Sequence, residues 1–481
     1  MTGHSGAGIL DAIVIGGGPN GLAAAIELAR AGRSVRLYEA ADTVGGGSRS
    51  AELTLPGFIH DPCSAVHPLA LASPFMRSLD PARRGLEWVH PDAPVAHALA
   101  PDRSVVLERD LDALEDAGWR RREARSWRRL LGPLVREWER LMPGLLGPVV
   151  RPPRHPILMV RFGLPALLPA TALARLAFRE PGTRALFTGF AAHSMLRLDR
   201  PLTASFGIVL GLLAHAVGWP LARGGSGRIV AMLEAEARSQ GVDIVTGHTV
   251  RSLSELPAAR AVVLDLTPRQ IVAVAGDRLP DRYRRELARY RYGAGVFKID
   301  WALDGPIPWR DPGTARAATV HLGGTLGEIA RAEDAVSRGR VPEEPFVLLV
   351  QPTVADPSRA PAGKHIAWAY CHVPHGSTVD MTAAIEARVE RFAPGFRDLV
   401  LGRGTRDAVA MEGYDANYVG GDINGGIQDI RQLLFRPVVR WNPYTTPDPG
   451  LFVCSSSTPP GGGVHGMSGL HAARAALRVT G

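Results

Sequence analysis

The sequence predicts an α/β fold in which segments from both ends of the chain contribute strands to one parallel sheet. Near the start, the apolar run 11–15 precedes the glycine-rich segment 16–21 and an alanine-rich stretch of helical character. Near the end, the apolar run 451–455 precedes the glycines of 461–466 and a second predicted helix. The recurring order of strand, glycine turn and helix is typical of parallel sheets covered by helices.

The N-terminal glycines have the spacing of a dinucleotide-binding turn. Gly16, Gly18 and Gly21 form the pattern G-x-G-x-x-G between a predicted strand and the predicted helix 22–31. The first glycine permits the tight turn, the second lets the backbone approach a pyrophosphate, and the third lets helix and strand pack closely. The helix N-terminus offers free N–H groups and a positive dipole end to phosphates. We therefore predict a Rossmann-like unit that binds a dinucleotide.

An acidic residue follows the next predicted strand, 34–38. Glu39 stands about 20 residues after the glycines, where an acid accepts a hydrogen bond from a ribose 2′-hydroxyl. The same carboxylate disfavours a 2′-phosphate, so NADP is not expected in this pocket.

Four stretches of the chain resemble phytoene-desaturase-type oxidoreductases. They are the C-terminal signature 453–467, and the segments 62–68, 224–226 and 420–426. The resemblance spans nearly the whole chain. Within this type of protein, the chain is similar in particular to the branch of pyridine nucleotide-disulfide oxidoreductase domain-containing protein 2. It implies FAD as the cofactor, and desaturation, saturation or isomerisation of a lipophilic substrate.

The resemblance also implies how the cofactor is held. In flavoproteins of the amine oxidase and phytoene desaturase type, a loop like 45–50 runs along the pyrophosphate, and its arginine, here Arg49, donates charge-assisted hydrogen bonds. A solvated loop charge is the alternative for Arg49. The C-terminal helix of such proteins points its N-terminus at the flavin pyrimidine and favours negative charge on the reduced ring. The predicted cofactor-binding residues are Gly16, Gly18, Gly21, Glu39, Gly46, Gly47, Arg49, Val250, Gly462, Gly463, Val464 and His465.

The implied fold is a two-dinucleotide-binding, Rossmann-like FAD domain of the glutathione-reductase and amine-oxidase type, interleaved with an α+β substrate domain. A chain of 481 residues is long enough for two such domains. The predicted FAD-binding segments are 1–80, 222–285 and 401–481. The predicted substrate-binding segments are 81–221 and 286–400, with a helical insertion.

Lys298, His67 and His193 are the candidate catalytic residues, although the flavin itself carries out hydride transfer at N5. The sequence around Lys298 is similar to that of flavin amine oxidases, in which a lysine is bonded through water to flavin N5. The alternative for Lys298 is an ion pair with Asp300, which shares its strand face. For the two histidines the alternative is an ordinary hydrogen-bonded buried side chain. No metal site is predicted.

The expected reaction is hydride transfer between an apolar small molecule and flavin N5, by a desaturase or dehydrogenase. Molecular oxygen or a quinone is the expected electron acceptor. The alternatives are a redox-neutral FAD-dependent isomerase, an amine-oxidase-like enzyme and a flavin-binding interaction protein without turnover. The oligomeric state is not predicted.

Composition excludes several other classes of function. The three cysteines, Cys63, Cys371 and Cys454, include no C-x-x-C pair, which excludes thiol–disulfide chemistry and fits a cytoplasmic protein. The net charge is +8, but no nucleic-acid recognition motif accompanies it, so no nucleic-acid partner is expected. The first eight residues are small and polar, so we expect no signal peptide.

Two uncharged apolar stretches raise the question of membrane contact. Residues 201–222 are long enough for a span of about 20 residues, but their glycines and prolines favour a buried helix that lines the substrate cavity. The stretch 162–174 is interrupted by Pro165 and Pro169. Together the two stretches predict either an apolar tunnel or an apolar surface patch that rests on a bilayer as a peripheral membrane contact.

Overall fold

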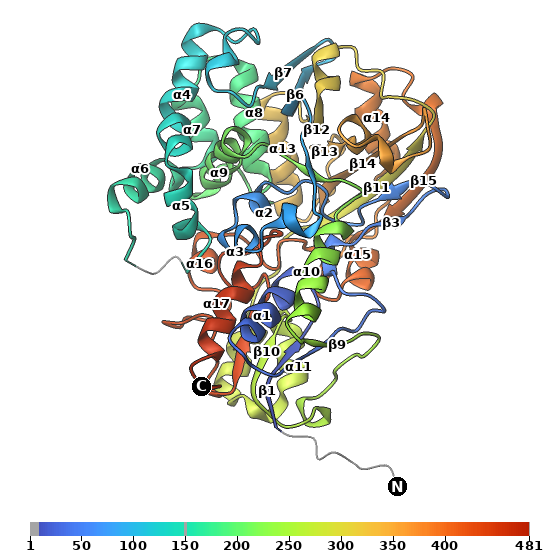
Figure 1. Ribbon diagram of the computed structural model, residues 1–481. Helices are drawn as coiled ribbons and strands as arrows, with labels where there is room; N and C mark the ends of the chain where they lie inside the picture. The colour runs from blue at the N-terminus through green and yellow to red at the C-terminus, as the bar shows by residue number, and fades with distance from the viewer. Residues whose placement is uncertain (1–8, 149–151, 481) are drawn as a thin grey trace.

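The computed structural model describes residues 9–148 and 152–480, which form two main sheets and a layer of helices (Figure 1). Residues 1–8, on which the expectation about a signal peptide rests, lie outside the described part of the chain. In Figure 1 the smaller sheet lies below and the larger sheet at the upper right, while helices gather at the upper left.

The smaller sheet is parallel throughout and combines strands from both ends of the chain. Its strands are buried runs rich in valine, isoleucine and leucine, as expected where helices cover both faces. In spatial order they are β16 (Leu451–Val453), β10 (Ala259–Leu264), β1 (Leu10–Ile15), β2 (Val35–Tyr38) and β9 (Asp243–Val245).

Alternate residues of β1 face different helices. Ala12 and Val14 belong to the core shared with α1 (Pro19–Arg30), α10 (Gly227–Ser239) and α17 (Met467–Ala476). Ile13 and Ile15 belong to the core shared with α11 (Pro268–Ala275) and α12 (Asp281–Ala288). The smaller sheet is therefore the middle layer of three.

The larger sheet has seven strands, and all neighbours are antiparallel except β12 and β6. Its strands in spatial order are β15 (Val400–Arg406), β11 (Gly295–Leu303), β14 (His365–Val373), β13 (Val347–Val350), β12 (Ala317–Leu322), β6 (Ala93–Ala100) and β7 (Arg103–Leu107). Two short pairs complete the strands: β3 (Ala51–Glu52) with β4 (Ile59–His60), and β5 (Trp88–Val89) with β8 (Leu221–Ala222).

A layer of helices packs around a core rich in aromatic side chains, among them Trp127, Phe187 and Phe190. Its members are α4 (Arg121–Arg136), α5 (Trp138–Leu145), α6 (Pro156–Ala166), α7 (Ala170–Ala177), α8 (Pro181–Ala192) and α9 (Thr203–Ala216). The remaining helices are α2 (Pro68–Ala72), α3 (Pro74–Ser78), α13 (Leu326–Ser337), α14 (Thr382–Phe392), α15 (Ala408–Tyr414) and α16 (Ile430–Leu434). The uncharged stretch 201–222 thus contains α9, whose side chains are largely buried.

No single helix in the described ranges is long and apolar enough to cross a membrane. Helices α6 and α7, which are bent by 100° relative to each other, are together long and apolar enough for a membrane span by length and composition alone.

The division into cofactor and substrate segments stays a prediction. Strand β15 pairs with β11 in the larger sheet, and the predicted boundary at residue 401 falls inside this strand.

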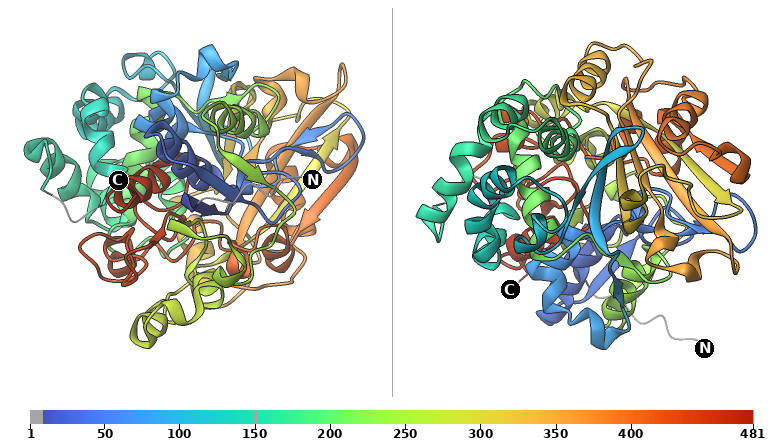
Figure 2. Two further views of the ribbon diagram at one scale, coloured as in Figure 1. Left: turned by 60° about the horizontal axis from the view of Figure 1, so that its bottom comes forward. Right: turned by 90° about the horizontal axis from the view of Figure 1, so that it is seen from above.

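The two ends of the chain meet where α1 and α17 lie side by side (Figures 1 and 2). A Cβ on Gly469 of α17 would lie 1.9 Å from the carbonyl oxygen of Asn20 in α1. A Cβ on Gly21 would likewise lie 1.9 Å from the carbonyl oxygen of Gly16. Only glycine permits backbone contact this close, so these two positions fix how α1 sits between the first turn and α17.

Replacing Gly469 by alanine tests this contact. We expect Gly469→Ala to lower the free energy of unfolding by about 1–3 kcal/mol, because the added methyl forces the two helices apart. Gly163→Ala in α6, where a Cβ meets nothing within 4 Å, is the matched control. It should be neutral or stabilise by up to about 1 kcal/mol. Equal unfolding free energies for the two variants in urea titrations would contradict the account.

Candidate functional site

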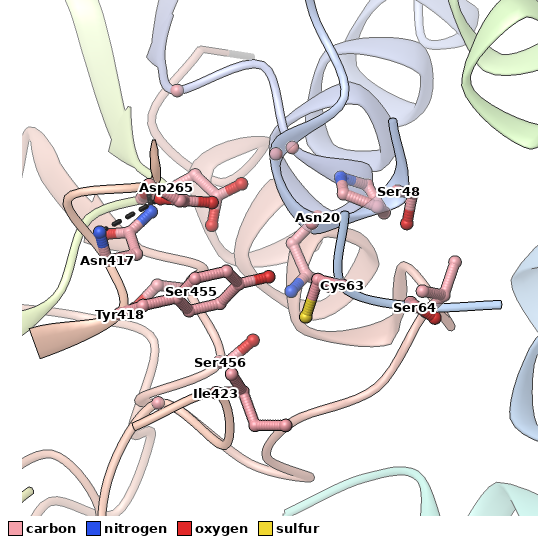
Figure 3. A pocket seen from close by; sticks show the side chains of 18 of the residues that line it. Asn20, Ser48, Cys63, Ser64, Asp265, Asn417, Tyr418, Ile423, Ser455 and Ser456 are labelled. Atoms are coloured by element: carbon pink, nitrogen blue, oxygen red, sulfur yellow. Dashed lines mark hydrogen bonds between the residues drawn. The ribbon is translucent and has the colours of Figure 1, made fainter. Parts of the chain in front are cut away.

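A cavity of about 870 Å³ is lined by residues of both sheets. One end is formed by the turn before α1, the loop 46–49, the end of β10 and the segment 413–418. The other end is formed by the larger sheet and α9. Figure 3 shows Asn20, Ser48 and Cys63 approaching the cavity from one side, opposite Tyr418.

The turn before α1 forms the polar end of the cavity. Gly16 and Gly18 line it, whereas Gly21 packs behind the turn. The Gly21 N–H donates to Oδ2 of Asp265 over 2.8 Å, which ties the first turn of α1 to the end of β10. The glycine pattern thus has the packing geometry that its spacing predicts.

Glu39 is fixed beside this turn. Its Oε2 accepts a hydrogen bond from the Gly17 N–H over 2.7 Å, and its Oε1 accepts one from the Ala41 N–H over 2.9 Å. Its side chain lines the cavity. The two backbone hydrogen bonds hold the carboxylate in the wall of the cavity, and its contact with a ribose stays a prediction.

Arg49 also lines the cavity, and its side chain is only 16% exposed. Its Nη2 donates to the Thr43 carbonyl oxygen over 2.7 Å and lies 3.4 Å from Oε1 of Glu39. Its guanidinium carbon lies 5.8 Å from the centre of the Tyr414 ring. The Arg49 side chain is therefore fixed in the cavity wall by these contacts and is not a solvated loop charge.

The glycines of the second loop are required by close contacts. A Cβ on Gly46 would lie 3.3 Å from the Gly18 Cα, and a Cβ on Gly47 would lie 1.8 Å from the Tyr418 hydroxyl oxygen. Both glycines line the cavity. The loop is thereby pressed against the first turn on one side and the 413–418 segment on the other.

Three buried polar atoms at this end have no hydrogen-bond partner among the described residues: Asn20 Oδ1, Ser48 Oγ and Arg49 Nε. All three side chains line the cavity. Buried polar atoms in folded proteins are nearly always hydrogen-bonded. The hydroxyl of Ser48 and the N–H of Arg49 suit phosphate oxygens, so the residues present fit a dinucleotide diphosphate.

Asp265 is the acidic centre of the polar end, and sequence analysis did not identify it as a site residue. Burial raises its pKa to about 8, and the nearby carboxylates of Asp415 and Glu39 add to the effect. Burial also raises the pKa of Asp415. A neutral Asp265 lessens the repulsion that a bound diphosphate would otherwise meet. The sequence signal that could have identified Asp265 is its place directly after β10, the strand that pairs with β1.

The pKa of Asp265 makes stability depend on pH in a defined window. The folded protein keeps a proton that the unfolded chain releases above about pH 4, so stability falls as pH rises towards about 8. We expect Asp265→Asn to remove up to about 1.4 kcal/mol per pH unit from that slope in cofactor-free protein.

Urea unfolding of cofactor-free protein across this pH range measures the slope. Asp116→Asn, at an exposed aspartate, is the control and should leave the slope as in the wild type. An unchanged slope in Asp265→Asn would show that Asp265 is ionised throughout the range.

The C-terminal turn closes the cavity from the other end of the chain. Gly463 and Val464 line the cavity, and so does Val250 of the loop after β9. Gly462 instead packs against the backbone of Asn424, where a Cβ would lie 3.1 Å from its Cα.

His465 supports the C-terminal turn from behind. Its Nδ1 accepts a hydrogen bond from the Met467 N–H over 3.0 Å, so its Nε2 carries the proton and donates to the Gly461 carbonyl oxygen over 3.2 Å. Burial lowers the pKa of His465 to about 4. The structure therefore buries His465 beneath the turn, and among the described residues it is Gly463 and Val464 of this turn that reach the cavity.

His67 lines the cavity but is held by two serines. Because the Ser226 hydroxyl donates to the Ser64 carbonyl oxygen, His67 Nε2 must donate to Ser226 Oγ, over 2.9 Å. His67 Nδ1 lies 3.3 Å from the Ser64 hydroxyl oxygen. Burial lowers the pKa of His67 to about 4, so the ring is neutral. This arrangement matches the hydrogen-bonded alternative.

His193 lines the cavity with a second histidine behind it. Its Nε2 lies 3.3 Å from Nε2 of His321, and one of the two nitrogens donates to the other. Burial lowers the pKa of His193 to about 3. His193 is therefore a neutral imidazole that presents hydrogen-bonding capacity, and not a cation, to the cavity.

Lys298 lies in β11 and is paired with Asp300, as the ion-pair alternative predicts. Its Nζ donates to Oδ1 of Asp300 over 2.5 Å and lies 5.0 Å from the centre of the Trp368 ring. Burial lowers the pKa of Lys298 and raises that of Asp300, while their mutual attraction opposes both shifts. Lys298 sits behind Trp368, which itself lines the cavity.

The far end of the cavity is apolar and aromatic. The rings of Trp368 and Tyr370 are stacked, with centroids 5.9 Å apart and planes inclined by 15°. The described carboxylates that line the cavity, Glu39, Asp265 and Asp415, all belong to the polar end. The side chains from the larger sheet, α9 and the loop after it are Leu210, Trp219, Thr319, Leu348, Val350, Trp368 and Tyr370.

The chain is similar in sequence to known proteins. Residues 14–75 match the model of the NAD(P)-binding Rossmann-like domain. The rat protein "Pyridine nucleotide-disulfide oxidoreductase domain-containing protein 2" is 27% identical, over 97% of this chain and 93% of that protein. An uncharacterized protein of Mycobacterium tuberculosis is 26% identical, over 97% of both chains. Residues 14–75 thus have a Rossmann-like fold, and the similarity to the rat protein's branch is confirmed.

Solved structures confirm the predicted fold class. An oxidoreductase from Methanosarcina mazei superposes with a TM-score of 0.67 at 16% identity, over 98% of this chain and all of that one. Putrescine oxidase superposes with a TM-score of 0.62 at 17% identity, over 98% of each chain. Cyclohexylamine oxidase from Brevibacterium oxydans gives a TM-score of 0.58 at 15% identity, over 98% of this chain and 99% of that one. The resemblance to phytoene desaturases stays a prediction.

Proposed function

We propose that the protein is an FAD-dependent oxidoreductase, a desaturase or dehydrogenase, that transfers hydride between an apolar small molecule and flavin N5. One observation carries this proposal: a single cavity joins a dinucleotide-binding end to an apolar, aromatic end. FAD is favoured over a nicotinamide dinucleotide because the C-terminal turn, at Gly463 and Val464, reaches the same cavity as the N-terminal glycines.

In this proposal the polar end holds the cofactor. The Gly16–Gly18 turn and Arg49 bind the diphosphate, Glu39 accepts from the ribose, and the turn at Gly463 faces the ring. When bound, FAD supplies the two-electron acceptance that a desaturation requires. The chain orients the substrate and supplies an apolar wall that excludes water. His193 is the neutral side chain that offers the substrate a hydrogen bond in the apolar end of the cavity.

The charges of the cavity favour an uncharged substrate. The far end presents aromatic and aliphatic side chains, and the described carboxylates of the lining stand at the cofactor end. A cationic amine would have to lose its hydration there without an opposite charge, which is costly. The apolar substrate is therefore our first candidate, with oxygen or a quinone as the proposed electron acceptor.

An amine-oxidase-like activity is the second candidate. It is favoured by the fold shared with putrescine oxidase and cyclohexylamine oxidase, and by the buried Lys298 behind Trp368. An FAD-dependent isomerase and a flavin-binding protein without turnover remain as alternatives.

The absorbance spectrum of the purified protein, with mass spectrometry of its cofactor and co-purifying small molecules, tests the proposal. FAD and an apolar ligand are expected. A folded, colourless protein that takes up no FAD would sink the proposal. With the substrate in hand, a product of equal mass would identify an isomerase, and flavin that no donor reduces anaerobically would indicate a protein without turnover.

Glu39 gives a specific test of the cofactor site. We expect Glu39→Ala to weaken FAD binding by about 10-fold or more, because both the ribose acceptor and the acceptor of the Gly17 N–H are lost. Glu39→Gln, which keeps a carbonyl acceptor at the same place, should bind FAD more tightly than Glu39→Ala. Flavin fluorescence titration measures both, and full FAD retention by Glu39→Ala would refute the ribose assignment.

Lys298 is tested for a role in oxygen reactivity. Removing Lys298 alone would deprive the buried Asp300 of its nearest cation and leave it facing Arg406, whose Nη1 lies 4.0 Å from Asp300 Oδ2. We therefore compare Lys298→Met with Lys298→Met/Asp300→Asn. If Lys298 assists the reaction electrostatically, reduced flavin should react with oxygen about 100-fold more slowly in both variants. Stopped-flow oxidation of the reduced protein measures this rate, and a wild-type rate in the double variant would leave Lys298 a structural ion-pair partner.

A further inference from the structure

The outer surface of α6 and α7 exposes large apolar side chains. Ile157, Val160 and Leu164 recur along one face of α6, and Ile157 and Leu164 are 81% and 66% exposed. Leu167 follows α6, and Leu176 in α7 is 74% exposed. We call these five residues the α6–α7 patch. Large exposed apolar side chains gathered on two consecutive helices are typical of a docking site.

The other side of the same helices explains why the patch faces outward. Phe162 of α6 and Leu173 and Ala174 of α7 are buried in the aromatic core of the helical layer. Each helix therefore already has a packed inner face, and the patch is a second apolar face that folding leaves uncovered. Single apolar side chains are common on protein surfaces, but several large ones exposed on the same two helices are not.

The charge around the patch identifies what it meets. Arg154, Arg161 and Arg175 are exposed and form no ion pair within the described residues. The sequence contains no acidic residue between Glu139 and Glu180. An apolar face surrounded by unpaired arginines is complementary to an anionic lipid surface, where the apolar side chains enter the interface and the arginines meet headgroup phosphates.

The patch is separated from the cavity by one helix. Both α6 and α7 pack on α9, and Leu210 of α9 lines the apolar end of the cavity. We propose that the α6–α7 patch docks the protein on the surface of an anionic bilayer. As a consequence that rests on the proposed function, the bilayer supplies the apolar substrate.

Vesicle co-sedimentation of the purified, flavin-loaded protein tests the docking. The wild type should bind phosphatidylcholine vesicles that contain phosphatidylglycerol more tightly than vesicles of phosphatidylcholine alone. Ile157→Ser/Val160→Ser/Leu164→Ser should bind anionic vesicles at least about 10-fold more weakly, because the apolar contribution is lost. Arg154→Gln/Arg161→Gln/Arg175→Gln should lose the preference for anionic vesicles.

Val379→Ser/Leu401→Ser/Val409→Ser removes exposed apolar side chains elsewhere on the surface and should bind like the wild type. Wild type that stays in the supernatant with anionic vesicles would overturn the proposal, and so would an α6–α7 serine variant that binds normally. Sedimentation velocity adds a further outcome: a wild-type dimer that the serine variant converts to monomer would assign the patch to a second copy of the chain instead.

Flavin content separates this test from that of the proposed function. The serine and glutamine variants should carry as much flavin as the wild type, because their positions are exposed and remote from the cavity lining. Vesicle binding without any flavin would contradict the proposed function and leave the docking intact. A protein that carries flavin but does not bind vesicles would contradict the docking and leave the proposed function intact.

Discussion

The backbone contact between α1 and α17 is the constraint on which the site depends. Gly469 lets α17 approach Asn20 of α1, and Gly21 lets α1 sit directly on the turn at Gly16. Because both helices begin at glycine turns that line the cavity, their packing brings two segments more than 400 residues apart in sequence to one cavity. The larger sheet and the helical layer, which the chain forms between these segments, then close the cavity with apolar side chains.

Charge divides this cavity into two unlike halves. The polar end gathers Arg49 with the carboxyl groups of Glu39, Asp265 and Asp415, and burial keeps Asp265 protonated until about pH 8. The far end offers aromatic rings and the buried, neutral His193, whose ring centroid lies 6.0 Å from that of Trp219. A ligand with a charged and an uncharged part fits such a division, and a reaction at the boundary would proceed away from water.

The sequence predicted those parts of the site that depend on local pattern. The strand–glycine–helix segments at both ends form as their patterns indicated, and Glu39 and the Gly46–Arg49 loop line the same cavity, while their part in binding a cofactor stays a prediction. Contributions that depend on how distant strands pair were not predictable, as with Asp265 and the stacked Trp368 and Tyr370. Position within a motif was also insufficient for His465, whose ring turns into the protein to hold the turn while Val464 faces the cavity.

In the proposed function, both ends of the chain hold one flavin. Hydrogen–deuterium exchange of the protein with and without FAD tests it most directly, since backbone protection is read separately for each segment. If both ends bind it, FAD protects the residues around Gly18 and Gly46 together with those around Gly463. Protection confined to the N-terminal segments would contradict it, because the C-terminal turn would then take no part in binding.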